Sequence, residues 1–436
     1  MESVALHLSK KINSIEAKIA VMGLGYIGLT LANEFLQAGF KVHGFDTSEE
    51  KINALVTGKN SFYDVSPDKI INALATGHFA ISTDKSILAD MDAVAICVQT
   101  PLRKTKDPDI SFIVQAVDIL KPYLHEQMLV VLESTTYPGM TDEVIKPAFE
   151  AQGFAVGKDL FLAYSPERVD PGNTKWGIRN TPRVIGGITK VCLDVACLLY
   201  SKVCDHLVPV SSTRAAELCK LYENLFRTVN IALANEVAIM SEHLGVDVWE
   251  VIEAAATKPF GFIPFYPGPG IGGHCLPIDP HYLSWKLRKL NYDAKFVALA
   301  SDINSSMPGY VARRIMSLLE EHGKKIDQSR IFILGVTYKA NVADIRESPA
   351  LDLIVRLKAY GADVIFFDPY VDELEYAGIH IPKVNPTDEE LSKSDCTVLI
   401  TDHSSFDLAR MISASKLFFD SRNAAKDFHD GKIHKL

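Results

Sequence analysis

The chain has 436 residues, of which 47% are hydrophobic and 23% charged, and its formal net charge is −9. This length predicts two or three globular domains, and an acidic balance without a basic block argues against nucleic acid as a partner. No apolar run approaches the roughly 18 residues of a membrane span, so we expect neither a membrane anchor nor a signal peptide. The seven cysteines include no CxxC pair, which favours a reducing cytoplasm and predicts neither a disulfide framework nor a metal site.

The first motif is a glycine-rich turn between a predicted strand at 18–22 and a predicted helix at 29–38. The turn, Gly23-Leu24-Gly25-Tyr26-Ile27-Gly28, has the GxGxxG spacing, and a second predicted strand at 41–45 leads to Asp46, about 20 residues further on. The first glycine permits the tight turn, the second lets the backbone approach a pyrophosphate, and the third lets helix and strand pack closely. Because an acid at this place accepts hydrogen bonds from ribose hydroxyls, the motif predicts NAD rather than NADP.

Three further apolar segments end in polar clusters. Segments 93–98, 129–132 and 161–164 have the continuous apolar character of buried parallel strands. They end at Gln99-Thr100-Pro101, at Glu133-Ser134-Thr135-Thr136-Tyr137-Pro138-Gly139 and at Ser165-Pro166-Glu167-Arg168. Each cluster alone is equally consistent with an ordinary turn, since Ser, Thr, Pro and Gly form turns. Beside a dinucleotide fingerprint they favour a binding edge, because ligands of doubly wound sheets bind at the carboxyl ends of strands.

A long helix is predicted from the Ser211-Ser212-Thr213 cap to Leu244, where Gly245 ends it. Its apolar residues keep the helical period, and the helix is long enough to link two domains and to offer a dimer face. Lys220, Asn224 and Arg227 form one polar stripe. A solvated face is the ordinary interpretation of such a stripe, but the rest of the helix is so apolar that the stripe is also suited to line a cavity.

The segment Gly268-Pro269-Gly270-Ile271-Gly272-Gly273-His274-Cys275-Leu276-Pro277-Ile278-Asp279-Pro280 combines a glycine-rich loop, a cysteine and an aspartate four residues later. Glycines let backbone N–H groups approach an anion, and a thiol beside such a loop has a lowered pKa and is nucleophilic. Asp279 is predicted to lie one helical turn from Cys275 on the same face. The alternative is a turn that contains a buried structural cysteine.

A second α/β unit follows, with predicted strands at 330–335, 364–369, 396–400 and 417–420. It contains no complete GxGxxG motif, so we expect no second NAD. Lys339 and Arg346 are candidates for binding phosphate or sugar, although isolated basic residues are more often exposed to solvent.

With these motifs in place, the chain resembles the UDP-glucose/GDP-mannose dehydrogenase family over essentially its whole length. The resemblance rests on the glycine turn at 23–28, Thr100-Pro101, Thr136-Tyr137-Pro138, Ser165-Pro166-Glu167, Lys220 with Asn224, Gly272-Gly273-His274-Cys275 with Asp279, Tyr338-Lys339, and Asp344-Ile345-Arg346-Glu347-Ser348. The forms at 133–138, 167–172 and 266–270 resemble the UDP-N-acetylhexosamine 6-dehydrogenases, and the N-acetylglucosamine branch most.

The resemblance implies an α/β fold in which two Rossmann-like doubly wound domains are joined by a long central helix and a helical domain. The expected boundaries are 1–208 for an NAD-binding domain, 209–320 for a central helical and dimerisation domain with the catalytic lysine and cysteine, and 321–436 for a UDP-sugar-binding domain. It also implies a cytoplasmic homodimer, or a higher homo-oligomer, that serves polysaccharide biosynthesis.

The implied reaction is an NAD-dependent four-electron oxidation of the C6 hydroxyl of UDP-N-acetylglucosamine to a carboxylate. An aldehyde has no hydride to give until a nucleophile adds, so Cys275 would form a thiohemiacetal and then a thioester, which water hydrolyses. The family pattern assigns Lys220 and Asn224 to the developing oxyanion, and Asp279 to orienting Lys220 or water. Thr136 and Glu167 would position water or relay a proton.

Two sets of binding residues are carried over from the family pattern. The implied NAD contacts are Gly23, Gly25, Tyr26, Ile27, Gly28, Asp46, Lys51, Thr100 and Thr136. The implied UDP-sugar contacts are Arg168, Val169, Lys220, Asn224, Arg227, Gly270, Gly272, Lys339 and Arg346.

Two departures from the family pattern concern the sugar more than the reaction. UDP-glucose members often carry Phe-Leu-Arg-Glu after Ser-Pro-Glu, whereas this chain has 168–171 as Arg-Val-Asp-Pro, so hydrolysis would rest on Glu167. The segment 260–265 lacks an arginine that many relatives lend to a neighbouring subunit, and Lys258 is a candidate replacement. An apolar segment there suits an acetamido methyl group.

Three alternatives stay open. The sugar could instead be UDP-N-acetylmannosamine, UDP-glucose or a galacto epimer. A single-hydride β-hydroxyacid dehydrogenase shares the two-domain plan and the lysine–asparagine helix but needs no cysteine. A non-catalytic NAD-sensing module would not require Lys220, Asn224, Cys275 and Asp279 together.

Overall fold

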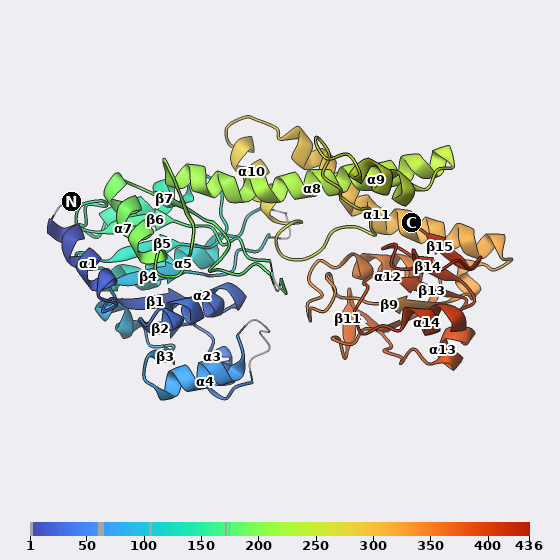
Figure 1. Cartoon of the computed structure of the whole chain (residues 1–436), viewed down its shortest axis with the longest axis horizontal. Helices are drawn as coiled ribbons and strands as arrows, with labels where there is room; N and C mark the ends of the chain where they lie inside the picture. Colours follow the sequence, from blue (N-terminus) through green and yellow to red (C-terminus); the bar gives the residue numbers. More distant parts are fainter. Residues whose placement is uncertain (1–2, 60–64, 104–106, 171, 174) are drawn as a thin grey trace. The chain divides into compact units, whose positions relative to one another are not determined.

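The computed structural model describes residues 3–59, 65–103, 107–170, 172–173 and 175–436 (Figure 1). The chain divides into two compact units. Unit 1 comprises residues 1–223 and 281–292, and unit 2 comprises residues 224–280 and 293–436. The chain passes from unit 1 to unit 2 within the long helix α8 (Thr213–Leu244) and returns briefly within α10 (Asp279–Arg288).

Unit 1 is built on a sheet of eight strands in the order β3-β2-β1-β4-β5-β6-β7-β8. Neighbouring strands are parallel except β6 and β7, which pair antiparallel. The strands are β1 (Lys18–Met22), β2 (Lys41–Phe45), β3 (Phe79–Ser82), β4 (Ala93–Ile96), β5 (Leu129–Leu132), β6 (Phe161–Tyr164), β7 (Arg183–Gly187) and β8 (Leu207–Val210). Because β3 to β6 follow the order of a dinucleotide-binding sheet, the carboxyl ends of β1, β4, β5 and β6 share one edge.

The helices of unit 1 cover the sheet and close its core. They are α1 (Ser3–Asn13), α2 (Tyr26–Gln37), α3 (Glu49–Val56), α4 (Pro67–Ala75), α5 (Ser111–Leu120), α6 (Lys146–Glu150) and α7 (Lys190–Tyr200), with short helical turns η1 (Lys85–Asp90), η2 (Lys121–Tyr123) and η3 (Thr141–Ile145). Helix α1 packs against α7 and buries Leu8 and Ile12 in the core. The N-terminal segment therefore forms part of the core of unit 1.

Helix α8 begins and ends where its caps predict. The Ser212 hydroxyl accepts the N–H of Ala215 at 3.2 Å, and Gly245 follows the last turn with φ +68°. The polar residues Lys220 and Asn224 are buried, whereas the apolar Tyr222 is 64% exposed. The buried face of the helix thus contains polar as well as apolar residues, and further apolar residues along the helix are exposed: Leu218, Phe226, Leu233, Met240 and Leu244.

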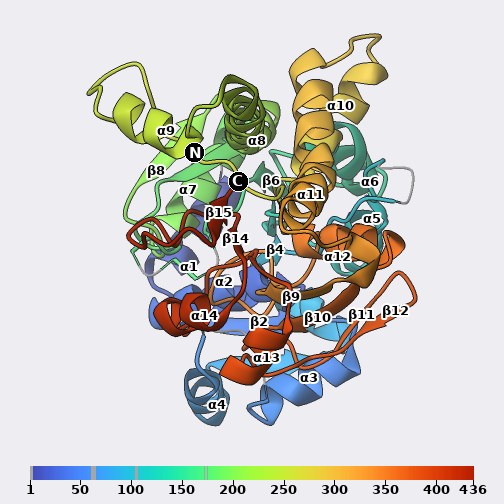
Figure 2. The same cartoon turned by 90° about the vertical axis from the view of Figure 1, so that its right-hand side faces the viewer.

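Unit 2 contains a parallel sheet of five strands in the order β10-β9-β13-β14-β15. The strands are β9 (Arg330–Leu334), β10 (Asp363–Phe367), β13 (Cys396–Leu399), β14 (Phe418–Asp420) and β15 (Ile433–Lys435), beside a hairpin of β11 (Leu374–Tyr376) and β12 (Ile379–Ile381). The remaining elements are α9 (Val248–Ala256), α11 (Lys295–Glu321), η4 (Ile326–Gln328), α12 (Pro349–Ala359), α13 (Asp388–Lys393) and α14 (Leu408–Ala414). Figure 2 shows α11 and α12 on one side of this sheet and α13 and α14 on the other, and a separate core cluster fills each side.

The α/β fold with two parallel sheets and a helical central region is therefore confirmed. Six strands of the described structure were not predicted from the sequence: β3, β7, β8, β11, β12 and β15. Strand β8 is short, contains Pro209 and is partly exposed, and β7 ends in two glycines, so neither has the continuous apolar character of β4 or β5. None of the helices in the described ranges combines the length and apolar character that crossing a bilayer requires.

Candidate active site

The glycine turn of unit 1 is shaped by contacts that exclude side chains at two of its glycines. Gly23 has φ +94°, and a Cβ atom there would lie 2.6 Å from the carbonyl oxygen of Cys97. At Gly28 a Cβ would lie 1.9 Å from the carbonyl oxygen of Gly23, because α2 leaves the turn in close contact with it. At Gly25, by contrast, a Cβ would meet no atom of the described residues within 4 Å. The second glycine therefore leaves open space beside the N-terminus of α2, where Tyr26 and Ile27 form the first turn.

Asp46 lies next to this turn, at the carboxyl end of β2, and is 6% exposed. Its carboxylate accepts the N–H of Leu24 at 2.8 Å and the N–H of Ser48 at 3.1 Å, and it pairs with the Lys51 ammonium at 2.7 Å. The fold thus brings the predicted turn, Asp46 and Lys51 together. Thr100 is buried just beyond the carboxyl end of β4, the strand next to β1.

A second group of predicted residues follows β5 and β6. Thr136 is fully buried, and its hydroxyl oxygen has no hydrogen-bond partner among the described residues. Glu167 is 7% exposed and accepts the backbone N–H of Val169. Burial raises the pKa of Glu167, while the nearby charge of Lys220 opposes that rise. A buried carboxyl group beside a buried lysine is suited to hold or relay a proton.

Arg168 is already engaged by protein groups. Its guanidinium binds the Glu223 carboxylate through two hydrogen bonds of 3.2 and 2.5 Å, and it donates to the carbonyl oxygen of Pro182. Glu223 lies on α8, three residues beyond Lys220. This pair therefore ties the loop after β6 to the helix that carries the buried lysine.

In unit 2, side chains of α8 and α10 form a hydrogen-bonded chain. The Asn224 amide nitrogen donates to the Asp279 carboxylate at 2.5 Å, and its amide oxygen accepts a hydrogen bond from Arg227 at 3.0 Å. These two contacts fix the orientation of the amide. Asp279 is 2% exposed, and its N–H donates to the carbonyl oxygen of Cys275 at 2.9 Å, which is the i→i+4 bond of one helical turn.

The thiol of Cys275 is exposed, so the alternative of a turn around a buried cysteine is wrong. The glycines before it lie against the segment 338–348. A Cβ at Gly272 would lie 2.6 Å from the carbonyl oxygen of Glu347, and a Cβ at Gly273 would lie 2.7 Å from the ring of Tyr338. Gly273 also donates its N–H to the carbonyl oxygen of Arg346 at 3.0 Å. The loop therefore approaches the backbone of Glu347 and the ring of Tyr338 more closely than a residue with a Cβ atom could.

Arg346 belongs to the same group as the cysteine. Its guanidinium binds the Asp344 carboxylate through three contacts of 2.6 to 3.0 Å. This hydrogen bonding raises the pKa of Arg346, and the charge of Cys275 contributes to the rise, so the thiol lies within electrostatic range of the guanidinium. Lys339 is partly buried on the turn after β9, and Gly270, with φ +130°, contacts Pro349 at the start of α12.

The segment 260–265 is exposed and apolar. Phe260 is 72% and Ile263 65% exposed. The ammonium group of Lys258, the candidate replacement for an arginine, lies 5.2 Å from the centre of the Phe260 ring. The predicted site residues as a whole fall into two sets. Unit 1 carries the glycine turn, Asp46, Lys51, Thr100, Thr136, Glu167, Arg168, Val169 and Lys220, and unit 2 carries Asn224, Arg227, Gly270, Gly272, Cys275, Asp279, Lys339 and Arg346.

Three family models match consecutive parts of the chain. They are the NAD binding domain of the UDP-glucose/GDP-mannose dehydrogenase family at residues 17–204, its central domain at 214–306 and its UDP binding domain at 332–427. The chain belongs to this family. It is therefore an NAD-dependent nucleotide-sugar dehydrogenase, with a domain for the cofactor and a domain for the UDP moiety of the substrate.

Relatives of known name span nearly the whole chain. The UDP-N-acetyl-D-mannosamine dehydrogenase of Methanococcus maripaludis is 34% identical over 419 residues, which are 93% of this chain and 92% of the relative. The UDP-N-acetyl-D-glucosamine 6-dehydrogenase of Salmonella typhi is 31% identical over 397 residues, which are 90% and 91% of the two chains. The structure of a UDP-D-ManNAc dehydrogenase from Pyrococcus horikoshii superposes with a TM-score of 0.87 at 32% identity, covering 96% of this chain and 99% of that one.

The residues of unit 1 fit NAD. The open space at Gly25, the N-terminus of α2 and the Asp46 carboxylate supply a place for a pyrophosphate and an acceptor for ribose hydroxyls. The unpartnered hydroxyl of Thr136, at the same sheet edge, is a buried polar atom that a ligand or a water molecule would satisfy.

The sequence did not predict a buried charged cluster that lies where β5 and β6 end and β7 begins. Arg183 binds the carboxylate of Glu133 and donates to the Ser165 hydroxyl at 2.8 Å, and the Tyr200 hydroxyl donates to the same carboxylate. Although burial by itself lowers the pKa of Arg183, the charge of Glu133 raises it above the ordinary value. The cluster anchors Ser165, two residues before Glu167. Glu133 stands in a quoted motif, but nothing local in the sequence identified Arg183 as its partner.

Arg422 was also missed. Its Nε donates to the carbonyl oxygen of Ile400 at 2.8 Å, and a Cβ at Gly268 would lie 2.7 Å from its guanidinium. Burial lowers the pKa of Arg422 to about 10. A cation is therefore placed against the first glycine of the cysteine loop, by a segment more than 150 residues further along the chain.

Proposed function

We propose that this enzyme oxidises the C6 hydroxyl of a UDP-N-acetylhexosamine to a carboxylate in two steps, and that Cys275 is the nucleophile of the second step. The observation that carries this proposal is the exposed Cys275 thiol, which lies within electrostatic range of Arg346 and is joined through its carbonyl oxygen to Asp279. An exposed thiol is accessible for attack on an aldehyde carbon.

NAD+ bound at the turn 23–28 would accept one hydride in each of the two oxidations. For the first, a base takes the proton of the C6 hydroxyl, and the buried pair of Glu167 and Lys220 is suited to receive and relay it. The resulting aldehyde has no hydride that can leave until a nucleophile adds. The Cys275 thiolate then forms a C–S bond to the carbonyl carbon, and the carbonyl π electrons move to oxygen as an alkoxide.

Loss of the second hydride from that thiohemiacetal leaves a thioester. Water attacks the thioester carbon and gives one proton to a base, and the C–S bond breaks to release the Cys275 thiolate. The carboxylic acid then loses the second proton to solvent and becomes the carboxylate. We assign Lys220 and Asn224 to stabilising the alkoxide. The Asp279 carboxylate accepts a hydrogen bond from the amide nitrogen of Asn224 and so holds that side chain in one orientation. Thr136 and Glu167 are assigned to positioning the water.

The names of the relatives and the sequence forms support two sugars. Relatives that are 33–35% identical over most of this chain are named UDP-N-acetyl-D-mannosamine dehydrogenases. The relative from Salmonella typhi supports UDP-N-acetylglucosamine, the sugar that the motif forms predict. An acetamido methyl group suits the exposed apolar segment 260–265. We propose UDP-N-acetylmannosamine as the first sugar to test and UDP-N-acetylglucosamine as the second.

The test is the amount of NADH released per mole of each limiting UDP-hexose, with the acid product identified by mass spectrometry. Two NADH per N-acetylhexosamine, with little from UDP-glucose, support the proposal. The Cys275→Ser variant should form no acid and release at most one NADH, whereas Cys197→Ser, at a half-buried thiol on α7, should behave like the parent enzyme. One NADH per sugar from the parent enzyme, or unchanged acid formation by Cys275→Ser, would move the assignment to the single-hydride class.

We further propose a homodimer that buries the exposed apolar residues of α8, since contiguous exposed apolar surface marks interaction sites. Replacing Tyr222 and Leu233 by lysine should give a monomer in analytical ultracentrifugation, and an unchanged mass would contradict this. The seven cysteines are all free, which suits the cytoplasm, and we retain the division at 1–208, 209–320 and 321–436 as a proposal.

A further inference from the structure

Unit 2 repeats the backbone turn that begins the NAD-binding sheet of unit 1. Strand β9 lies between β10 and β13, as β1 lies between β2 and β4. Gly335 has φ +78° and donates its N–H to the carbonyl oxygen of Phe367 at 2.9 Å, and Gly23 donates to Phe45 in the same way at 2.8 Å. Asp368 therefore stands at the end of β10 where Asp46 stands at the end of β2.

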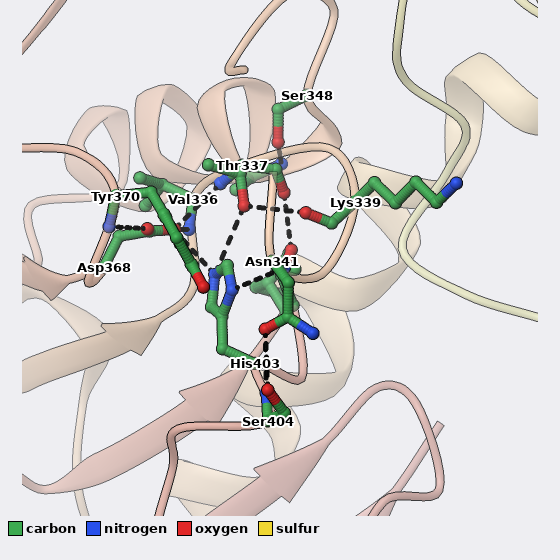
Figure 3. A network of polar contacts seen from close by, with 12 residues as sticks. Val336, Thr337, Lys339, Asn341, Ser348, Asp368, Tyr370, His403 and Ser404 are labelled. Atoms are coloured by element: carbon green, nitrogen blue, oxygen red, sulfur yellow. Dashed lines mark hydrogen bonds and ion pairs between the residues drawn. The ribbon is translucent and has the colours of Figure 1, made fainter. Parts of the chain in front are cut away.

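The two acids have different partners. Asp46 is held by backbone N–H groups and by the partly exposed Lys51. Asp368 is fully buried, and its carboxylate lies 3.0 Å from the Nε2 atom of His403, whose side chain is also fully buried (Figure 3). In unit 2 a histidine thus contacts Asp368, whereas the equivalent acid of unit 1, Asp46, is the one that the dinucleotide motif assigns to the ribose hydroxyls. Although burial by itself raises the pKa of Asp368, hydrogen bonds from His403 and from backbone N–H groups lower it below the ordinary value.

The hydrogen bonds assign the tautomer of His403. Its Nδ1 accepts the backbone N–H of Asn341 at 3.0 Å, so the ring hydrogen is on Nε2. That N–H faces the Asp368 carboxylate at 3.0 Å and the Thr337 hydroxyl at 3.2 Å. The neutral ring therefore donates on one side and accepts on the other, and it bridges two points of the chain.

Together, His403 and Asp368 hold both ends of the turn 336–341, which is visible in Figure 3. Asp368 accepts the N–H groups of Val336 at 2.7 Å and Thr337 at 3.1 Å, and His403 accepts that of Asn341. Asn341 has φ +61°, a left-handed conformation that costs energy, and its side-chain oxygen accepts two hydrogen bonds from Ser404. The left-handed residue at the end of the turn is thus held by hydrogen bonds to both its backbone and its side chain.

The centre of this turn contacts the cysteine loop. It carries Tyr338, whose ring lies so close to Gly273 that a Cβ there would be 2.7 Å away. Tyr338 also donates its N–H to the carbonyl oxygen of Asp344 at 3.0 Å, and Asp344 binds Arg346, whose carbonyl oxygen accepts the N–H of Gly273. A continuous series of contacts therefore runs from buried His403 to the loop two residues before Cys275.

We propose that His403, paired with Asp368, is a positioning residue of the dehydrogenase: it pins the turn 336–341 so that Tyr338 and Lys339 hold the cysteine loop and the UDP moiety in place. Its role for turnover rests on the proposed function of Cys275. Its role in UDP binding and in ordering the two segments does not depend on that function.

The test compares two amide variants that each keep one half of the ring's hydrogen bonding. In His403→Asn the amide oxygen takes the place of Nδ1 and retains the bond from Asn341, whereas in His403→Gln the amide nitrogen takes the place of Nε2 and faces Asp368. We expect His403→Gln to bind UDP about tenfold more weakly and to lose about 10- to 100-fold in kcat/KM for the UDP-sugar, since small misplacements have effects of this size. His403→Asn should have a UDP affinity and a kcat/KM much closer to those of the parent than His403→Gln has. The affinity for NAD+ should be unchanged in either variant.

Hydrogen exchange distinguishes positioning from general destabilisation. In His403→Gln, amides of 336–341 and 270–275 should exchange faster, while those of β10, β13 and unit 1 stay as in the parent. The proposal would be overturned if His403→Gln kept the hydrogen exchange and the UDP affinity of the parent. It would also be overturned if exchange were faster throughout unit 2 and both variants lost UDP affinity and kcat/KM to the same extent. If Cys275→Ser retains acid formation, the proposed function fails, but UDP affinity and exchange still decide the role of His403.

Discussion

Replacing Arg183 by methionine should destabilise the protein far more than losing an ordinary ion pair. Arg183 is 5% and Glu133 2% exposed, and the guanidinium also lies 4.4 Å from the centre of the Tyr200 ring. Methionine keeps much of the length of the side chain. It leaves the Glu133 carboxylate buried, with Tyr200 as its one remaining side-chain hydrogen-bond donor among the described residues. Removing one partner of a buried pair typically costs about 3–5 kcal/mol, because the remaining charge is uncompensated.

For a domain of this size, 1 kcal/mol corresponds to roughly 2–4 °C in Tm, so the expected fall is about 6–20 °C. The matched control is Arg410→Met. Arg410 pairs with Asp388 at 2.6 Å, but the two side chains are 40% and 70% exposed, and exposed pairs are worth about 1 kcal/mol or less. Its Tm should therefore fall by no more than about 4 °C.

The assay is differential scanning calorimetry of the two single variants and of the double variant Glu133→Gln/Arg183→Met. Glutamine keeps an acceptor for the Tyr200 hydroxyl and removes the buried charge, so the double variant should be more stable than Arg183→Met by at least about 1 kcal/mol. Equal Tm values for Arg183→Met and Arg410→Met would refute the reasoning. A double variant no more stable than Arg183→Met would show that the uncompensated charge is not the cause.

Three further predictions concern the candidate site. Burial raises the pKa of Glu167 above 4.5, so between 4.5 and that higher pKa the folded protein keeps a proton that the unfolded chain has lost. The parent therefore loses stability as pH rises through this window, and the Tm of Glu167→Gln relative to the parent should increase from pH 4 to 8; parallel curves would contradict this. Gly25→Ala should keep the parent Tm and raise the KM for NAD+ about tenfold, because its Cβ enters the space beside the helix N-terminus that we assign to a phosphate. The control Gly28→Ala should lower the Tm, because its Cβ would lie 1.9 Å from the carbonyl oxygen of Gly23. A Gly25→Ala enzyme with unchanged KM would exclude the assigned phosphate position. Gly273→Ala should lower kcat/KM for the UDP-sugar at least about tenfold by displacing Tyr338. Gly261 also has positive φ, but a Cβ there would meet no described residue within 4 Å, so Gly261→Ala should cost only about 1–2 kcal/mol of stability. Equal activity in the two variants would argue against the contact between Gly273 and Tyr338.

Local features of this protein were predictable from sequence because short-range geometry determines them. The glycine turn before α2, the limits of α8 and the single turn from Cys275 to Asp279 each depend on a few consecutive residues whose caps, periodicity and φ preferences are local. The same holds for the continuous apolar strands β4, β5 and β6, whereas β8, with Pro209 and partial exposure, has no such pattern.

Only the tertiary structure decided which polar groups meet. Arg183 is 50 residues from Glu133, Asn224 is 55 from Asp279 and His403 is 35 from Asp368, and no periodicity links such positions. Asp368 and His403 meet because they follow the carboxyl ends of β10 and β13, which share one edge of a parallel sheet. Arg183 reaches Glu133 because β7 runs antiparallel to β6, so its first residue lies at the edge where β5 ends. Asn224 and Asp279 meet as side chains of the helices α8 and α10. The exposed Tyr222 and the buried Lys220 on α8 follow from the same cause: an isolated helix defines its faces, but its neighbours decide which face is buried.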